Sequence, residues 1–201
     1  MLRIGLTGGF ASGKSFVGQA LKELGCRLIE ADELGHQALL PGGEAYEGVI
    51  KEFGAGILGP GGAIDRRKLA ALVFDRPDRL AVLNGLVHPP VIRQEERLIA
   101  EYAVQDPEAI VVVEAAILIE TGSYKRFERL ILAFCNEEQQ IERAIHRNGI
   151  GRDEVLARLR RQMPLEEKKQ FADYVIDTSG TKGDTLRQVA ETYRLLRSIT
   201  K

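Results

Sequence analysis

The chain has 201 residues, of which 44% are hydrophobic and 28% charged, and its formal net charge is −1. This composition is typical of a soluble globular protein, and the balanced charge excludes a bulk electrostatic attraction to nucleic acid or to acidic membranes. Because there is no apolar run of membrane-spanning length and no signal-peptide layout at the amino end, we expect a cytoplasmic protein. The only cysteines, Cys26 and Cys135, lie in apolar stretches and predict buried thiols.

Short β-type runs alternate with helical patterns along most of the chain. The run 109–114, AIVVVE, is almost continuously apolar, as is typical of a strand covered on both faces. This alternation predicts an α/β fold with a parallel sheet. The expected strands are residues 2–7, 27–30, 109–114, 130–135 and 174–177, and the helical patterns between them are 14–24, 137–147, 152–162 and 183–197.

One segment, from about residue 40 to residue 104, interrupts the alternation. It contains helical patterns at 66–74, 78–86 and 90–103, no convincing strand, and a glycine-rich stretch that we expect to be partly loop. We interpret this segment as a helical insertion beside the sheet. The charge-dense residues 148–169 predict a second insertion. The core of this single unit would then comprise about 1–39, 105–147 and 170–201.

Residues 6–15 read LTGGFASGKS and fit G-x-x-x-x-G-K-S between an expected strand and an expected helix. Glycines permit backbone angles that turn several N–H groups around one anion, and the helix that begins there adds its positive end. Lys14 can reach the β- and γ-phosphates, and the Ser15 hydroxyl can ligate Mg²⁺. The stretch predicts a nucleoside triphosphate site, the alternative being a glycine turn with a chance GKS. Its expected ATP-binding residues are Gly8, Gly9, Phe10, Ala11, Ser12, Gly13, Lys14, Ser15 and Phe16.

Two carboxylates lie at the carboxyl ends of expected strands, where parallel sheets bind ligands. Asp32 comes just after the second strand. It can accept a proton from an attacking hydroxyl or cap the helix that follows, and the sequence leaves both roles open. Glu114 ends the third strand and can hold Mg²⁺ directly or through water. The alternative for Glu114 is a solvated charge at a strand end.

Two arginines, Arg143 and Arg147, lie four residues apart on an expected helix and therefore share a face. Guanidinium groups donate paired hydrogen bonds to phosphate oxygens. A lid carrying them over a triphosphate would neutralise charge and exclude water during transfer. For each arginine alone, an ordinary surface ion pair is the alternative. We expect at least one of the pair to act on phosphate.

Several segments occur in the order and spacing found in dephospho-CoA kinases, and the sequence resembles that family over nearly its whole length. The resemblance implies a P-loop kinase fold with a five-stranded parallel sheet, a helical CoA-binding insertion and a helical lid. It also implies phosphorylation of the ribose 3′-hydroxyl of dephospho-CoA by ATP with Mg²⁺, the last step of coenzyme A synthesis. ATP and dephospho-CoA are then the expected partners of a monomer or weak homo-oligomer. The segments are LTGGFASGKS, EADELGHQAL, DRRKLAALVF, LNGLVHPPV, VVEAAILIETG, RNGIGRDEVLARLRRQM and ADYVIDTSG.

The resemblance implies roles for individual residues. It makes Asp32 the base on the ribose hydroxyl. The remaining implied positions are Arg66, Arg67 and His88 on the CoA side, Arg143 and Arg147 at the lid, and the loop Thr178 to Gly180 beside the adenine of ATP.

Some positions depart from the pattern common in that family. Ala11 stands where glycine is frequent, which matters little if its backbone angles are ordinary. Glu114 and Ala116 replace an aspartate and a proline, so the contact of Glu114 with Mg²⁺ is left open between direct and water-mediated. Thr178 replaces an asparagine, which weakens any specific adenine hydrogen bond at that position.

Two other functions stay open from the residues alone. One is a nucleoside or nucleoside monophosphate kinase on the same scaffold, and the other is a non-catalytic nucleotide switch. The sequence contains no N-K-x-D motif, which argues against a switch that reads guanine.

Overall fold

The computed structural model describes residues 1–73 and 76–199. The chain divides into two compact units, which we call the sheet unit (Met1–Glu30 with Ile99–Lys201) and the helical unit (Ala31–Leu98). Each unit has its own buried core. The expected partition into core, insertion and lid stays a prediction.

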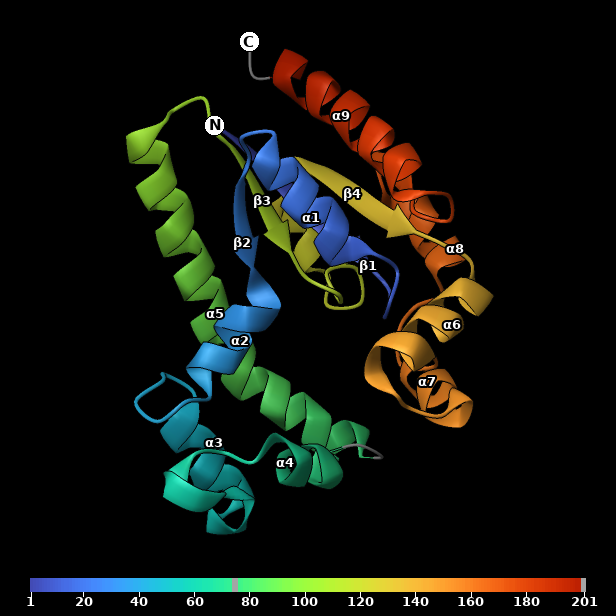
Figure 1. Ribbon diagram of the computed structural model, residues 1–201. Helices are drawn as coiled ribbons and strands as arrows, with labels where there is room; N and C mark the ends of the chain where they lie inside the picture. Colours follow the sequence, from blue (N-terminus) through green and yellow to red (C-terminus); the bar gives the residue numbers. More distant parts are fainter. Residues whose placement is uncertain (74–75, 200–201) are drawn as a thin grey trace. The chain divides into compact units, whose positions relative to one another are not determined.

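The sheet unit is built on five parallel strands in the order β2-β3-β1-β4-β5 (Figure 1). The predicted α/β fold is therefore confirmed. Because β1 lies between β3 and β4, the strand order reverses at β1, and its carboxyl end is the point where such sheets bind ligands. The strands are β1 (Leu2–Gly8), β2 (Arg27–Glu30), β3 (Ile110–Glu114), β4 (Arg129–Phe134) and β5 (Tyr174–Asp177).

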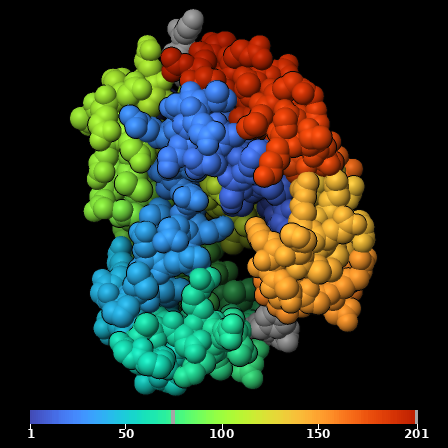
Figure 2. All heavy atoms as spheres, viewed as in Figure 1, coloured from blue at the N-terminus to red at the C-terminus, as the bar shows by residue number. Residues whose placement is uncertain are grey.

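Helices α1 and α9 lie side by side on one face of this sheet (Figures 1 and 2). Ile4 and Leu6 of β1 point to that face and are buried with Val17 and Leu21 of α1, because alternate strand residues share a face. Val113 of β3 is also fully buried, as expected for a sheet covered on both faces. The helices of this unit, with the end of α5 given below, are α1 (Lys14–Glu23), η3 (Ser123–Arg126), α6 (Glu137–Asn148), α7 (Arg152–Leu159), α8 (Leu165–Lys168), η4 (Lys169–Phe171) and α9 (Lys182–Ile199).

The helical unit forms its core from the apolar faces of short helices. Val49, Ile57 and Leu69, from three different helices, are buried together. The helix α3 lies in the stretch expected to be partly loop, although its apolar residues recur at helical spacing. The elements are α2 (Ala31–Ala38), α3 (Tyr46–Phe53), η1 (Ala55–Ile57), η2 (Pro60–Gly62), α4 (Arg66–Val73) and most of α5 (Pro77–Gln105). Phe74, the last residue of the expected helix 66–74, lies outside the described residues.

The long helix α5 corrects one prediction. Residues 78–86 and 90–103 were expected to form two helices, but a single helix of 29 residues runs through Pro89 and Pro90. Each proline removes a backbone donor, at a cost that normally ends a helix. Here Pro90 and the following Val91 are buried, so packing outweighs the local preference. None of the described helices is both long enough and apolar enough to cross a membrane.

Both cysteines are buried free thiols, as predicted. Cys26 lies in the core under α1 and α9. Burial raises the pKa of the Cys26 thiol to about 12 and also raises the pKa of Cys135. Both therefore favour the unreactive thiol form.

Candidate functional site

Two positions in the glycine loop between β1 and α1 favour glycine, Gly8 because of its close neighbours and Gly13 because of its backbone angle. At Gly8, a Cβ atom would lie 2.4 Å from Ser12 Oγ, and at Gly13 the φ angle is +86°. Gly13 is the N-cap of α1, so the first turn of that helix faces the loop. Free N–H groups and a positive helix end are the features that bind a phosphate.

Three residues that the sequence singled out meet beside this loop. Glu114 Oε1 accepts hydrogen bonds from Lys14 Nζ at 2.6 Å and from Ser15 Oγ at 2.7 Å. The Glu114 side chain is only 3% exposed, which excludes the alternative of a solvated strand-end charge. The acid therefore holds the two side chains that were expected to bind phosphate and metal.

The donor atoms of this cluster fit Mg²⁺. The Ser15 hydroxyl and the Glu114 carboxylate are adjacent hard oxygen ligands, which Mg²⁺ prefers. Glu114 Oε2 is buried and has no hydrogen-bond partner among the described residues. Mg²⁺ commonly uses one carboxylate from the protein and completes its shell with water and substrate phosphates.

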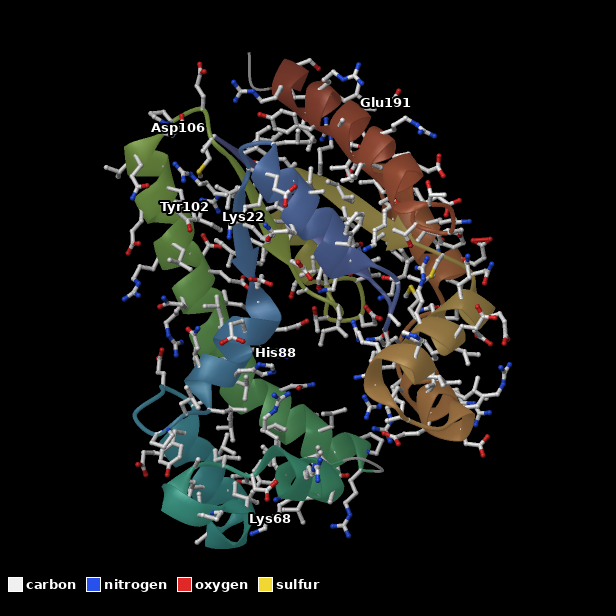
Figure 3. All side chains as sticks on the ribbon, in the orientation of Figure 1. Lys22, Lys68, His88, Tyr102, Asp106 and Glu191 are labelled. Atoms are coloured by element: carbon white, nitrogen blue, oxygen red, sulfur yellow. The ribbon has the colours of Figure 1, made fainter. Side chains whose placement is uncertain are left out.

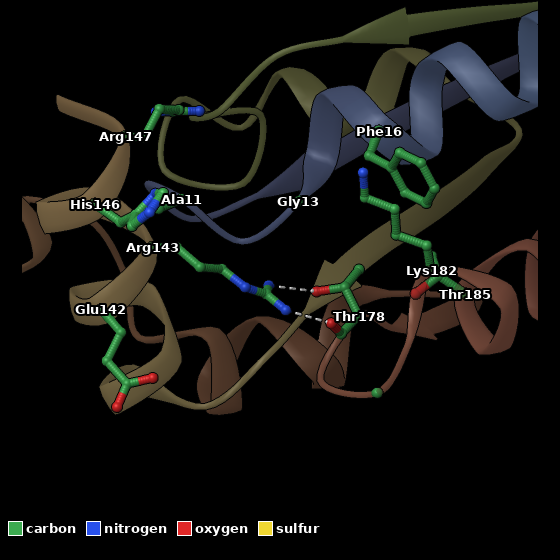
Figure 4. Close-up of a pocket in the computed structure, with 11 residues that line it drawn as sticks. Ala11, Gly13, Phe16, Glu142, Arg143, His146, Arg147, Thr178, Lys182 and Thr185 are labelled. Atoms are coloured by element: carbon green, nitrogen blue, oxygen red, sulfur yellow. Dashed lines mark hydrogen bonds between the residues drawn. The ribbon is translucent and has the colours of Figure 1, made fainter.

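A cavity of about 740 Å³ opens next to the glycine loop (Figure 4). Several predicted site residues line it together, and it also contains side chains that the sequence reasoning missed, His146 and Lys182. The Lys182 ammonium lies 5.9 Å from the centre of the Phe16 ring. The predicted residues that line the cavity are Ala11, Gly13, Phe16, Arg143, Arg147, Thr178 and Gly180.

Thr178, the residue directly after β5, contacts the glycine loop. Its hydroxyl donates to the carbonyl oxygen of Ser12 at 2.7 Å, and its side chain would lie 3.2 Å from a Cβ at Gly13. Arg143 donates to the Thr178 hydroxyl at 3.1 Å and to its carbonyl oxygen at 2.5 Å (Figure 4). In this structure Arg143 thus joins α6, the loop after β5 and, through Thr178, the glycine loop.

The tip of the glycine loop is fastened to the helices around it. The Phe10 N–H donates to Gln162 Oε1 at 2.8 Å, and the Phe10 carbonyl oxygen accepts from Gln140 Nε2 at 2.6 Å. The guanidinium carbons of Arg147 and Arg158 lie 5.8 and 5.3 Å from the centre of the Phe10 ring. These cation–π contacts place Arg147 beside Phe10 of the glycine loop, and its expected action on phosphate stays a prediction.

Lys168, a residue without a predicted role, is completely buried beneath the loop. Its ammonium forms an ion pair with Glu120 at 2.8 Å and donates to the carbonyl oxygen of Ala116 at 3.0 Å and of Gly8 at 3.5 Å. Burial lowers the pKa of Lys168, and the bond to Glu120 opposes this shift. Lys168 therefore ties α8 to the end of β1 at a desolvation cost.

Replacing Lys168 by methionine is expected to lower the free energy of unfolding by about 3 kcal/mol, because the buried ion pair and two carbonyl contacts are lost. Urea unfolding at neutral pH measures this change. The exposed Lys22 on α1 (Figure 3) provides a control, because Lys22→Met is expected to change stability by less than about 0.5 kcal/mol.

The unmodified protein and Lys168→Met are also expected to differ in how their stability depends on pH. The unfolded chain holds the Lys168 proton up to a pKa of 10.5, whereas the folded protein releases it at lower pH. Between these two pKa values the unfolded state binds more protons, so the unmodified protein gains stability as pH rises. The stability gap to Lys168→Met should therefore be wider near pH 10 than at neutral pH. A constant gap would contradict the lowered pKa.

Ala11 has a backbone conformation that the sequence did not lead us to expect. Its φ angle is +58°, and it is the only described residue other than glycine with a positive φ. The expectation that alanine matters little here was conditional on ordinary backbone angles, and this condition is not met. A left-handed conformation costs an L-residue roughly 1–2 kcal/mol.

Ala11→Gly is accordingly expected to raise the free energy of unfolding by about 0.5–1 kcal/mol, after the greater entropy of glycine in the unfolded chain is subtracted. The control is Ala100→Gly on the exposed surface of α5, which should lower stability by about 1 kcal/mol. Denaturant unfolding of both variants tests the difference in sign. A loss of stability on Ala11→Gly would show that the loop carries no such strain.

The helical unit carries the other predicted residues. Asp32 is exposed and lies in the first turn of α2, two residues beyond the end of β2. Of the two roles left open for Asp32, that of N-cap does not fit, because α2 already begins at Ala31. A carboxylate in this first turn still interacts favourably with the helix dipole.

The residues expected on the CoA side lie on two helices of the same unit. Arg66 and Arg67 are exposed at the start of α4, where Asp65 Oδ1 accepts from the Arg67 N–H at 2.9 Å. His88 is half-buried on α5 (Figure 3), and burial lowers the pKa of its imidazole below the usual 6.5. The neutral ring is therefore favoured near pH 7.

A glycine loop at the switch point of a parallel sheet, followed by a helix that begins with lysine and serine, defines a P-loop nucleotide-binding protein. The sequence model described as dephospho-CoA kinase matches residues 2–184. The chain belongs to the dephospho-CoA kinase family.

Individual relatives agree with this assignment. The dephospho-CoA kinase of Carboxydothermus hydrogenoformans is 44% identical over 92% of this chain and 90% of its own length. That of Aquifex aeolicus is 40% identical over 98% of both chains. A solved structure from Thermus thermophilus has a TM-score of 0.80 and 34% identity, covering 96% of each chain. The dephospho-CoA kinase from Campylobacter jejuni, with a TM-score of 0.60, 22% identity and 96% coverage of both chains, supports the fold alone.

Proposed function

We propose that this chain transfers the γ-phosphoryl group of ATP directly to the ribose 3′-hydroxyl of dephospho-CoA, giving coenzyme A and ADP. Membership of the dephospho-CoA kinase family supports the substrate. The observation that carries the mechanism is the meeting of Lys14 and Ser15 on the buried carboxylate of Glu114, next to the glycine loop. This cluster positions a cation and a hydroxyl where a triphosphate would bind.

The residues from Gly8 to Phe16 would hold the phosphates of ATP, with Lys14 stabilising the charge that spreads over the transferred group. The cavity beside the loop has the size and the aromatic wall to take the adenosine part, with Thr178 and Gly180 on its rim. Arg143 and Arg147 line the same cavity and would add positive charge near the phosphates.

Ser15 and Glu114 are the residues that would hold Mg²⁺. When bound, the ion neutralises negative charge on the phosphate oxygens. This favours the approach of the acceptor hydroxyl to the phosphate. The protein's part is to keep the serine hydroxyl and the carboxylate side by side, which the 2.7 Å contact between them achieves.

Asp32 would orient the acceptor hydroxyl and take its proton. Its side chain is exposed in the first turn of α2, where a bound sugar would reach it. Arg66, Arg67 and His88 would contact dephospho-CoA, whose diphosphate suits guanidinium groups.

Incubating the protein with ATP, Mg²⁺ and dephospho-CoA tests this function. The expected product is coenzyme A, detected by mass analysis as the acceptor plus one phosphoryl group, with an equal amount of ADP. Nucleoside monophosphates and free nucleosides serve as competing acceptors. Rapid transfer to one of those, with dephospho-CoA left unchanged, would overturn the proposal.

A further inference from the structure

The second turn of α1 contains a glycine whose presence the helix itself does not explain. Gly18 is buried inside α1, well away from either end of the helix. Glycine in a helix interior is destabilising relative to alanine, because it loses more backbone entropy on folding. A buried interior glycine therefore indicates that something else occupies the space of its side chain.

The group that occupies this space is the carboxylate of Glu114. A Cβ atom at position 18 would lie 2.5 Å from Glu114 Oε2, which is closer than atoms can approach without a shift. The next neighbours, Leu6 Cδ2 and Leu28 Cδ1, would be at 3.3 and 3.4 Å and need to give way only slightly. The conflict is thus specific to the acid.

Glu114 cannot move away without disturbing the phosphate site. Its other oxygen, Oε1, holds Lys14 Nζ at 2.6 Å and Ser15 Oγ at 2.7 Å. Rotation of a carboxylate moves both of its oxygens, so a displacement of Oε2 also displaces Oε1. Since the side chain is only 3% exposed, few alternative positions are open to it.

We propose that Gly18 is a positioning residue for nucleotide binding: the missing side chain at position 18 makes room for the long acid at position 114, which in turn holds Lys14 and Ser15. A glutamate at position 114 thus requires glycine at position 18, whereas an aspartate, shorter by one methylene, does not. The functional part of this inference rests on the proposed role of Lys14 and Ser15 in binding ATP.

The test compares Gly18→Ala, Glu114→Asp and the double variant with the unmodified protein. Dissociation constants for ADP are measured by calorimetry in the absence of metal, together with unfolding temperatures and rates of coenzyme A formation. Gly18→Ala alone should weaken ADP binding about tenfold, a size within the range for coupled neighbours. In the Glu114→Asp background, the same substitution should weaken it less than about threefold.

A matched control is Gly85→Ala, which introduces the same side chain into α5 where no atom lies within 4 Å. It should raise the unfolding temperature and leave ADP binding unchanged. An equal effect of Gly18→Ala in both backgrounds would overturn the proposal, because it would place the conflict at Leu6 and Leu28 instead. An unchanged ADP affinity in Gly18→Ala would also overturn the proposal.

These measurements also distinguish a failure of this inference from a failure of the proposed function. If the unmodified protein bound no ADP, the proposed function would fail. The unfolding temperatures would then still report whether Glu114→Asp relieves the effect of Gly18→Ala.

Discussion

Lys14→Ala is expected to lower kcat/KM for coenzyme A formation by about 10³-fold, the scale on which a single preorganised charge contact stabilises a transition state. Lys14 begins α1 beside the glycine loop and is held by Glu114 at 2.6 Å. Its ammonium would meet the phosphate oxygens as their charge spreads during transfer. ATP binding should weaken at the same time, because the same charge also contacts the ground state.

Two measurements make the Lys14 result specific. The unfolding temperature must be followed, because the substitution leaves the buried Glu114 carboxylate with fewer donors and is destabilising on that account. Lys22→Ala removes an exposed lysine from the same helix and should leave the rate unchanged. A folded Lys14→Ala protein with a normal rate would refute the role assigned to this residue.

Asp32→Asn is expected to reduce kcat by about 10²–10⁴-fold, which is the usual contribution of a general base. Asparagine keeps the size and the hydrogen-bonding oxygen of the side chain but cannot take a proton. ATP affinity should change little, because Asp32 is proposed to act on the acceptor alone. Steady-state rates and ATP binding measured on the same preparation distinguish these effects.

The control for Asp32 is its neighbour Glu33, an exposed acid in the same first turn of α2. Glu33→Gln removes a comparable interaction with the helix dipole, worth about 0.3–1 kcal/mol, without removing the proposed base. Its kcat should stay near that of the unmodified protein. Near-normal turnover in Asp32→Asn would show that Asp32 stabilises α2 but does not act as the base.

The features that could be predicted from the sequence depend on local patterns. β3 is apolar up to its last residue, Glu114, because both of its faces are covered, and the order of residue types alone displays this pattern. The glycine loop and Lys14 follow from spacing alone, because the backbone and charge needed to hold a phosphate restrict the residue types.

The features that could not be predicted depend on contacts between distant segments. Lys168 is indistinguishable in sequence from its exposed neighbours, and only the fold brings it to the carbonyl groups of Gly8 and Ala116. The positive φ of Ala11 is likewise imposed by the loop around it. In α5, burial overrode the rule that proline ends a helix, because local preference is a weak guide where packing decides.

The two hydrogen bonds that hold the Phe10 backbone have a thermodynamic consequence. Its N–H and its carbonyl oxygen are bonded to Gln162 and Gln140, so a movement of either glutamine away from the loop must break a hydrogen bond to the loop's own backbone. Any ligand that binds differently to the fastened and the released loop shifts the balance between them. A substitution that weakens either glutamine contact therefore changes the affinity of that ligand, by at most the ratio of its affinities for the two states of the loop.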